Sequence, residues 1–160
     1  MRSILVILAA GLAAGCGPYL IRGPQISKDA EIEDNPTNRE LIQVMERYRV
    51  AMERRDLPAL LALASKSYYE RAGTTATDDD YSYEGLERIL KERLAKVKDL
   101  RLRIEIDQIL LRGNLAVIDY TYHGQFMVRS GKGALWKEKS WESRMTLERV
   151  EGRWLITSGM

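Results

Sequence analysis

The hydrophobic positions between residues 37 and 98 repeat every three or four residues in three successive segments. This spacing puts apolar side chains on one face of a helix, so it predicts amphipathic helices over residues 37–55, 57–72 and 83–98. Thr37 to Glu40 has the spacing of a capping box, and Asp56 can cap the second helix. The predicted buried faces contain Leu41, Val44, Met45, Tyr48 and Met52, then Leu57, Leu60, Leu61, Ala64 and Tyr68, then Leu86, Ile89, Leu90, Leu94 and Val97.

After Asp99 the hydrophobic period changes to two, which predicts half-buried β-strands. The expected strands cover residues 100–111, 115–128, 134–150 and 153–158. The phase of the first strand shifts by one residue, which predicts a β-bulge near Asp107 and Gln108. Three helices followed by an antiparallel meander predict an α+β domain over residues 37–160. Its helices would lie on one face of a curved sheet of about four strands.

The N-terminal stretch "MRSILVILAAGLAAGC" has neither pattern. Arg2 precedes an apolar run of about 11 residues, within the ~7–15 residues of a signal peptide and short of the ~20 that span a bilayer. A buried core helix and an ordinary secretion signal are the alternatives. Neither explains why the only cysteine of the chain, Cys16, directly follows the run.

The segment from Leu12 to Cys16 resembles the lipobox of bacterial lipoproteins. That resemblance implies that residues 1–15 are a removed signal peptide and that Cys16 carries the lipid. Membrane attachment then needs no transmembrane helix, since more than one acyl chain gives stable anchoring. Glycine at position 17 favours, by the same resemblance, the outer membrane facing the periplasm. We therefore expect a lipid-anchored protein of the cell envelope.

Residues 16–36 are rich in glycine, proline and polar residues, which predicts a lipidated tether. About 20 flexible residues span roughly 25 Å. The whole chain has a formal net charge of +2, with 25 basic and 23 acidic residues interleaved along it. Nucleic-acid binders concentrate basic charge on one face, so nucleic acid is not an expected partner.

The predicted domain resembles the nuclear transport factor 2-like superfamily, a cone-shaped α+β fold shared with polyketide cyclases and steroid isomerases. The similarity rests on the element order, the turn Arg55-Asp56-Leu57, the strand start Gly113 to Val117, and the closing segment Leu147 to Ile156. An unrelated α+β sandwich is the alternative. Because the superfamily includes enzymes, ligand binders and scaffolds, the resemblance does not select a function.

The sequence offers few candidates for catalysis or metal binding. His123 is the only histidine, and Asp78-Asp79-Asp80 lacks the spacing of a calcium loop. Strand alternation predicts that Asp119 and His123 point away from the cone, which would then hold tyrosines and aliphatic residues without a catalytic pair. No catalytic residue, metal or cofactor is expected.

Seven aromatic residues are candidates to line a ligand pocket inside the cone, although a filled core is the favoured interpretation because aromatic residues supply much of any core. They are Tyr48, Tyr68, Tyr120, Tyr122, Phe126, Trp141 and Trp154. The leading hypothesis is a non-enzymatic envelope protein that binds or scaffolds a partner, because a tether raises the effective concentration of a partner in the same membrane. The second is a small-molecule isomerase, cyclase or ligand binder. A homodimer through the outer face of the sheet is a further expectation.

Overall fold

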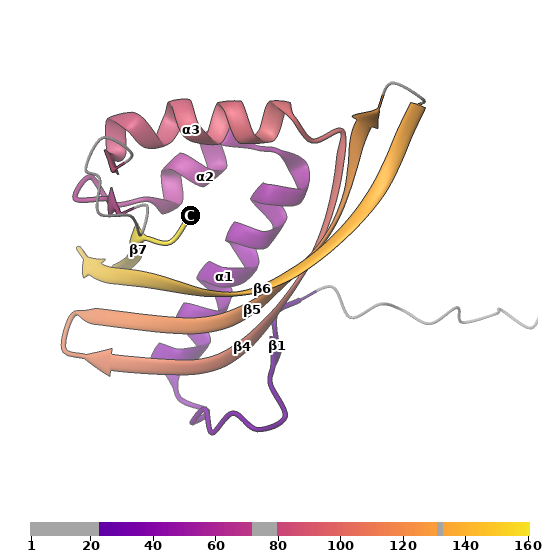
Figure 1. The fold of residues 1–160 in the computed structure, drawn as a ribbon. Coiled ribbons are helices and arrows are strands. Elements are labelled where there is room, and N and C mark those ends of the chain that lie inside the picture. Colours follow the sequence, from indigo (N-terminus) through magenta and orange to yellow (C-terminus); the bar gives the residue numbers. More distant parts are fainter. Residues whose placement is uncertain (1–22, 72–79, 131–132) are drawn as a thin grey trace, which may run out of the picture.

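The computed structural model describes residues 23–71, 80–130 and 133–160, so the predicted signal peptide, Cys16, Asp78 and Asp79 lie outside the described residues. Helices α1 (Pro36–Arg54), α2 (Leu57–Leu63) and α3 (Tyr83–Ala95) lie on the concave side of a strongly curved sheet (Figure 1). The sheet contains β1 (Gln25–Ile26), β4 (Asp99–Arg112), β5 (Leu115–Ser130), β6 (Gly133–Val150) and β7 (Arg153–Ser158) in the order β1-β4-β5-β6-β7. Strands β2 (Tyr69–Glu70) and β3 (Tyr81–Ser82) form a separate ribbon. The predicted α+β class is confirmed.

The sheet has five strands rather than the predicted four. The extra strand, β1, pairs in parallel with β4, with Gln25 opposite Glu105. It comes from the predicted tether, of which Gln25, Ile26 and Ser27 therefore bond to the sheet. The sequence pattern missed this strand because two residues are too few to show an alternation.

The second helix is shorter than predicted. Asp56 caps α2 by accepting a hydrogen bond from the backbone N–H of Ala59, but the helix ends at Leu63 rather than at residue 72. The backbone N–H of Ser65 donates to Ile156 O of β7 at 2.7 Å, so sheet contacts replace the next helical turn. The first helix also differs at its start, where the side chain of Asn35, rather than a capping box, accepts from the N–H of Asn38.

The long strands follow the predicted alternation closely. The pairing of β4 with β5 shifts between Ile106 and Gln108, which confirms the predicted bulge. At Gly124, strand β5 keeps its register with both β4 and β6, so no bulge occurs there. Residues opposite one another share a face, so Tyr120 and Tyr122 point into the concavity and Asp119 and His123 point away.

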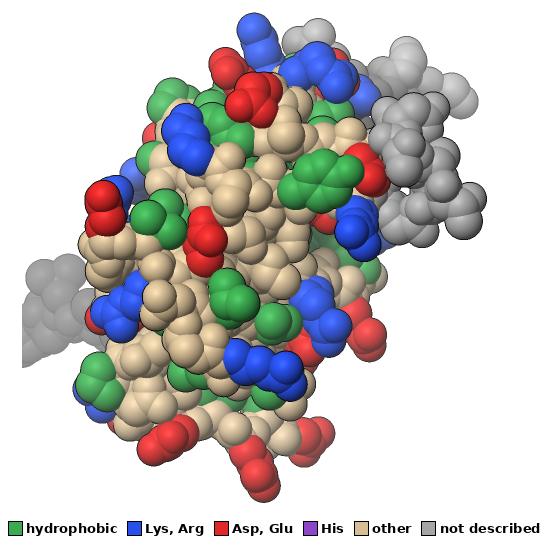
Figure 2. All heavy atoms as spheres, turned by 90° about the vertical axis from the view of Figure 1, so that its left-hand side faces the viewer, with side chains coloured by type: hydrophobic (Ala, Val, Ile, Leu, Met, Phe, Trp, Pro, Cys, Tyr) green, Lys and Arg blue, Asp and Glu red, His purple; other side chains and the backbone are tan. Residues whose placement is uncertain are grey.

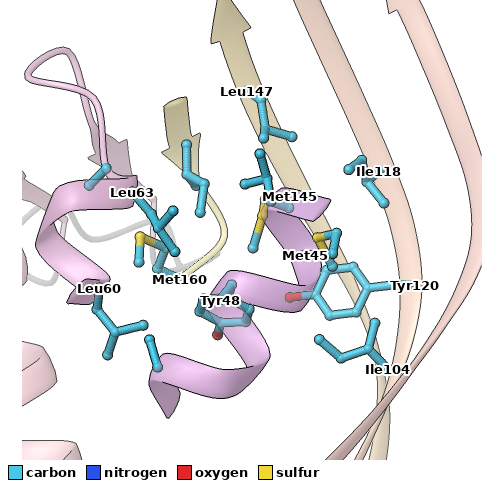
Figure 3. Close-up of a cluster of buried hydrophobic side chains, with 14 of the residues drawn as sticks. Met45, Tyr48, Leu60, Leu63, Ile104, Ile118, Tyr120, Met145, Leu147 and Met160 are labelled. Carbon is cyan, nitrogen blue, oxygen red and sulfur yellow. The ribbon is translucent and has the colours of Figure 1, made fainter. Parts of the chain in front are cut away.

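The concavity is filled at one end by a single core. Figure 3 shows Met45 and Tyr48 of α1 facing Ile104, Ile118 and Tyr120 of the sheet. The buried cluster also contains Leu60, Leu63, Leu86, Leu90, Met145, Leu147, Ile156 and Met160. In the part of the chain that the structure describes, no helix is both long and apolar enough to cross a membrane.

Candidate functional site

A cavity of about 710 Å³ lies inside the cone, between α1, α3 and the concave faces of β5 and β6. This volume is within the range of small-molecule sites. The walls are formed mainly by aromatic and aliphatic side chains: Tyr48, Met52, Tyr81, Ile89, Leu90, Leu94, Tyr120, Tyr122 and Trp141. Glu70, Arg71 and Arg93 add charge, and Gly159 and Met160 close one side.

The tyrosines of the wall are neutral hydrogen-bonding groups. Desolvation by burial raises the pKa of Tyr48, Tyr120 and Tyr122 above the ordinary tyrosine value. A hydrogen bond that the Ser143 hydroxyl donates to Tyr120 lowers the pKa of Tyr120, but by less than burial raises it. Each phenol therefore keeps its proton at neutral pH and can donate or accept a hydrogen bond.

One phenol of the wall has no partner. The hydroxyl oxygen of Tyr81 is fully buried and makes no hydrogen bond to any described residue. The Tyr81 ring stacks on Tyr68, with ring centroids 6.2 Å apart. A buried polar atom without a partner costs about 1–3 kcal/mol, so such atoms are rare in folded proteins.

A carboxylate also lines the cone, which corrects the expectation of tyrosines and aliphatic residues alone. Glu70 Oε2 accepts a hydrogen bond from Tyr68 Oη at 2.9 Å and another from the Gly159 N–H at 2.6 Å. The hydroxyl of Tyr68 in turn accepts from the Met160 N–H at 3.2 Å. The sequence pattern missed Glu70 because residues 57–72 were expected to be helical, which leaves position 70 off the predicted buried face.

Arg93 and Arg71 supply positive charge at the mouth of the cavity. Both side chains are exposed, and both contribute to the lining. Arg93 Nη1 donates to the backbone oxygen of Met160 at 3.3 Å. The interior of the cone is therefore mainly aromatic and also contains the Glu70 carboxylate, whereas its rim is basic.

The seven aromatic residues predicted to line the cone divide into two groups. Tyr48, Tyr120, Tyr122 and Trp141 line the cavity, and the Trp141 ring lies against Tyr122 with centroids 4.3 Å apart. The other three are not among the lining residues, which corrects the prediction for Tyr68, Phe126 and Trp154. Tyr68 and Trp154 are buried in the core, and Phe126 packs against it from the far half of β5.

Asp119 and His123 lie on the outer face of the sheet, as the alternation predicts. Asp119 forms a bidentate ion pair with Arg144 at 2.6 and 2.8 Å. His123 Nδ1 is 2.8 Å from Ser140 Oγ, and its other nitrogen is 3.6 Å from a Glu105 oxygen. His123 borders a second hollow of about 620 Å³ between polar side chains of β4, β5 and β6. Neither residue can reach a molecule in the cone.

On the side that contains the β4–β5 turn, basic, acidic and hydrophobic side chains lie among one another (Figure 2). Among the described residues, no group of three or more His, Cys, Asp or Glu side chains is arranged to hold a metal ion. The cone is thus the candidate site, and its chemistry comes from phenols, one carboxylate and two guanidinium groups.

No protein-family model and no curated protein matches the sequence. Several solved structures match the fold. A ketosteroid isomerase-like protein from Erwinia carotovora atroseptica has a TM-score of 0.65 and 16% identity, over 78% of this chain and 94% of that one. A nuclear transport factor 2-like superfamily protein from Salmonella enterica gives 0.64 and 14%, over 76% and 86%. A conserved protein from Planctomyces limnophilus gives 0.65 and 14%, over 77% and 92%. The domain therefore has the nuclear transport factor 2-like fold.

Proposed function

We propose that this protein is a lipid-anchored envelope protein whose cone binds a small molecule without transforming it. The anchor is Cys16 in its lipobox context, and the binding site is the cavity of about 710 Å³. The ligand has an apolar or aromatic body that fits the tyrosine walls and an anionic group near Arg93. The observation that carries this proposal is the make-up of the cavity, in which neutral buried phenols form the walls and the exposed guanidinium of Arg93 lies at the mouth.

Binding is favoured over catalysis by the state of Glu70. Its Oε2 already accepts two hydrogen bonds, from Tyr68 and from the Gly159 backbone, so both lone pairs of that oxygen are engaged. Only Oε1 of Glu70 is then left to act as a general base, and a base must come within about 3 Å of the proton that it removes. In this arrangement Glu70 fixes the wall of the cavity and holds residues 159 and 160 in place.

The test is ligand binding to the purified protein, with the aromatic anion anilinonaphthalene sulfonate as the probe. Arg93→Gln should weaken probe binding about tenfold, since the anion loses one charged hydrogen-bond donor. Arg88→Gln is the matched control, because Arg88 is an exposed arginine of the same helix outside the lining. Equal affinities for the Arg93 and Arg88 variants would contradict the proposal.

The anchor has a separate test. Wild-type protein from cell envelopes should partition into the detergent phase, and a Cys16→Ser variant should not. Cross-linking in intact cells then tests the alternative purpose of the tether: recovery of one specific envelope protein, with an empty cone, would favour a scaffolding role over ligand binding.

An isomerase- or cyclase-like enzyme is the second candidate function, because a carboxylate does lie in the cone. In that case Glu70 Oε1 would act as the base and the neutral phenols of Tyr120 and Tyr122 would donate hydrogen bonds to the developing oxyanion. Glu70→Gln separates the two candidates. It would abolish turnover of an enzyme substrate, whereas a binding protein would keep most of its affinity for the probe.

A further inference from the structure

One wall of the cavity continues beyond the mouth of the cone onto the hairpin of β5 and β6, which extends past the end of α3 (Figure 1). Trp141 of β6 lines the cavity and is also 38% exposed. Its ring lies against the buried Tyr122 ring, with ring centroids 4.3 Å apart. Trp141 therefore belongs both to the wall of the cavity and to the surface outside it.

Beyond Trp141 the concave face of this hairpin carries an open strip of side chains. Residues opposite one another in a sheet share a face, and every second residue of a strand returns to it. The register of β5 and β6 pairs Tyr122 with Trp141, so the strip outside the cavity contains Phe126, Leu135, Lys137 and Lys139. Leu135 is 53% exposed and both lysines are exposed, whereas Phe126 is half-buried. The strip therefore offers apolar surface together with two ammonium groups.

The strip is basic because Glu138, the acidic residue between the two lysines, points away from it. Glu138 lies on the outer face, where its carboxylate accepts a hydrogen bond from Gln125 Nε2 at 2.6 Å. On the concave face, Lys139 Nζ lies over the Trp141 ring, 5.0 Å from its centroid. An ammonium group has three donors, so Lys139 can keep this cation–π contact and also donate to an anion beside the ring.

A third cation, Arg93, lies toward the same end of the cone. Arg93 is in the last turn of α3 and lines the cavity. The chain then passes from α3 to the sheet beside the hairpin, since the Lys98 N–H donates to Met127 O of β5 at 2.9 Å. Met127 directly follows Phe126 of the strip. A molecule that leaves the cavity at Arg93 can therefore continue onto the strip.

We propose that the ligand of the cone is an elongated organic anion that is longer than the cavity and continues along the strip. This proposal rests on the proposed binding function of the cone. The apolar body of the ligand occupies the cavity, and its first anionic group meets Arg93. The outer segment is apolar or aromatic, lies against Trp141, and carries a second anionic group to Lys139 and Lys137. A compact ligand would end at Arg93 and leave this continuous surface unused.

An elongated ligand fits the strip better than a β-strand of a partner protein. A partner strand adds to a sheet through backbone hydrogen bonds along an open edge. Strand β7 pairs with β6 only from Thr146 to Val150, so among the described residues the edge of β6 beside the strip is open. Lys137 and Lys139 lie on that edge strand, however, and lysines there oppose pairing. The side chains of the strip instead lie on the face of the sheet, where they are continuous with the cavity.

The experiment titrates the purified protein with two fluorescent probes of the same chemistry and different length. They are anilinonaphthalene sulfonate and its covalent dimer, bis-anilinonaphthalene sulfonate. The second aromatic unit and second sulfonate of the dimer can reach the strip, whereas the monomer ends at the mouth. The wild-type protein should therefore bind the dimer about tenfold more tightly than the monomer.

Replacing the lysines of the strip tests this advantage directly. Lys137→Gln/Lys139→Gln should weaken dimer binding about tenfold and monomer binding less than about twofold, because neither lysine lines the cavity. Lys28→Gln/Lys91→Gln is the matched control, since it removes two exposed lysines that lie outside both the cavity lining and the strip. The control should change the affinity for either probe less than about twofold.

The two tryptophans of β6 form a second matched pair. Trp141→Ala should weaken the binding of both probes, and that of the dimer more strongly. Trp136 is 41% exposed on the outer face, and the Arg101 guanidinium lies 5.0 Å from its ring centroid, so it has the same setting on the wrong side of the sheet. Trp136→Ala should leave the affinity for both probes unchanged.

The outcomes separate this proposal from the proposed function. If the ratio of the two affinities is the same in the wild-type protein, in Lys137→Gln/Lys139→Gln and in the lysine control, the proposal is overturned. In that case a loss of monomer binding in Arg93→Gln would still support a cone that binds a compact ligand. Equal monomer binding by Arg93→Gln and Arg88→Gln would overturn the proposed function and this proposal with it. Recovery of a protein paired along β6 by cross-linking at Lys137 would also overturn the proposal.

Discussion

Gly159 closes one side of the cavity, and its replacement by alanine tests how tightly that side is built. Its φ is +93°, a conformation that side chains rarely adopt. A Cβ at this position would lie 2.2 Å from the backbone oxygen of Arg144 and 2.9 Å from Met145 Cα. These are backbone atoms of a paired strand, so residues 159 and 160 must move instead.

The loss of folding stability follows from the contacts that such a movement breaks. Met160 is 8% exposed, and re-exposing its side chain costs about 2 kcal/mol. The Gly159 N–H loses its bond to the Glu70 carboxylate, worth about 1–2 kcal/mol. We expect Gly159→Ala to lower the free energy of unfolding by about 3 kcal/mol and Tm by about 9 °C.

Gly152→Ala is the matched control. Gly152 also has a positive φ, +79°, but nothing lies within 4 Å of the added Cβ. Its replacement should therefore lower the free energy of unfolding only by the cost of a side chain at positive φ, about 1 kcal/mol. Urea denaturation of the two variants measures the difference. If both lose the same stability within about 0.5 kcal/mol, residues 159 and 160 do not pack as described and the cavity wall is wrong.

Three further predictions concern single groups. Asp56→Ala should destabilise the domain by about 1 kcal/mol in urea because α2 loses its cap, whereas Asp56→Asn should retain most of it. Hydrogen bonding to Arg144 lowers the pKa of Asp119, so this pair stabilises the fold above the ordinary aspartate pKa of 3.8 and less as pH falls through the folded-state pKa. Asp119→Asn should cost at most about 1 kcal/mol at neutral pH and nothing in strong acid, as measured by denaturation at several pH values. Burial raises the pKa of four tyrosines: Tyr48, Tyr68, Tyr120 and Tyr122. The stability that these neutral phenols give the fold is therefore fully present below the ordinary tyrosine pKa of 10.0 and is lost as pH rises above it. Phenolate absorbance should show them ionising only together with alkaline unfolding.

The strands were predictable because their evidence is local. Alternation over 14 to 18 residues in β4, β5 and β6 leaves one consistent assignment of faces. The same alternation located the bulge and placed Asp119 and His123 outside the cone. The shift in apolar phase at Asp107 is visible in the sequence, since a bulge moves every later residue to the other face.

The end of α2 was not predictable from local pattern. Ala64 and Tyr68 continue the helical spacing, so the sequence favours a longer helix. Instead, the backbone of residues 64 and 65 pairs with strand β7, which lies some 90 residues later in the sequence. Long-range backbone pairing outweighs a weak helical preference over so few residues. With the helix ended, Glu70 turns into the cone rather than toward solvent.

The sequence by itself determined the α+β order, the long strands and their faces, and the buried helical stripes. The resemblance of residues 12–16 to a lipobox, on which the proposed anchor rests, is also a property of the sequence alone. Each depends on neighbours within a few residues or on a strict period. Only the tertiary structure decided which aromatics meet in the cavity and which fill the core. It also brought Glu70, Arg93 and Gly159 together and left the Tyr81 hydroxyl without a hydrogen-bond partner among the residues that the structure describes. These contacts join residues up to 89 positions apart in the chain. No local pattern records such a distance, because the curvature of the sheet and the packing of the helices set it.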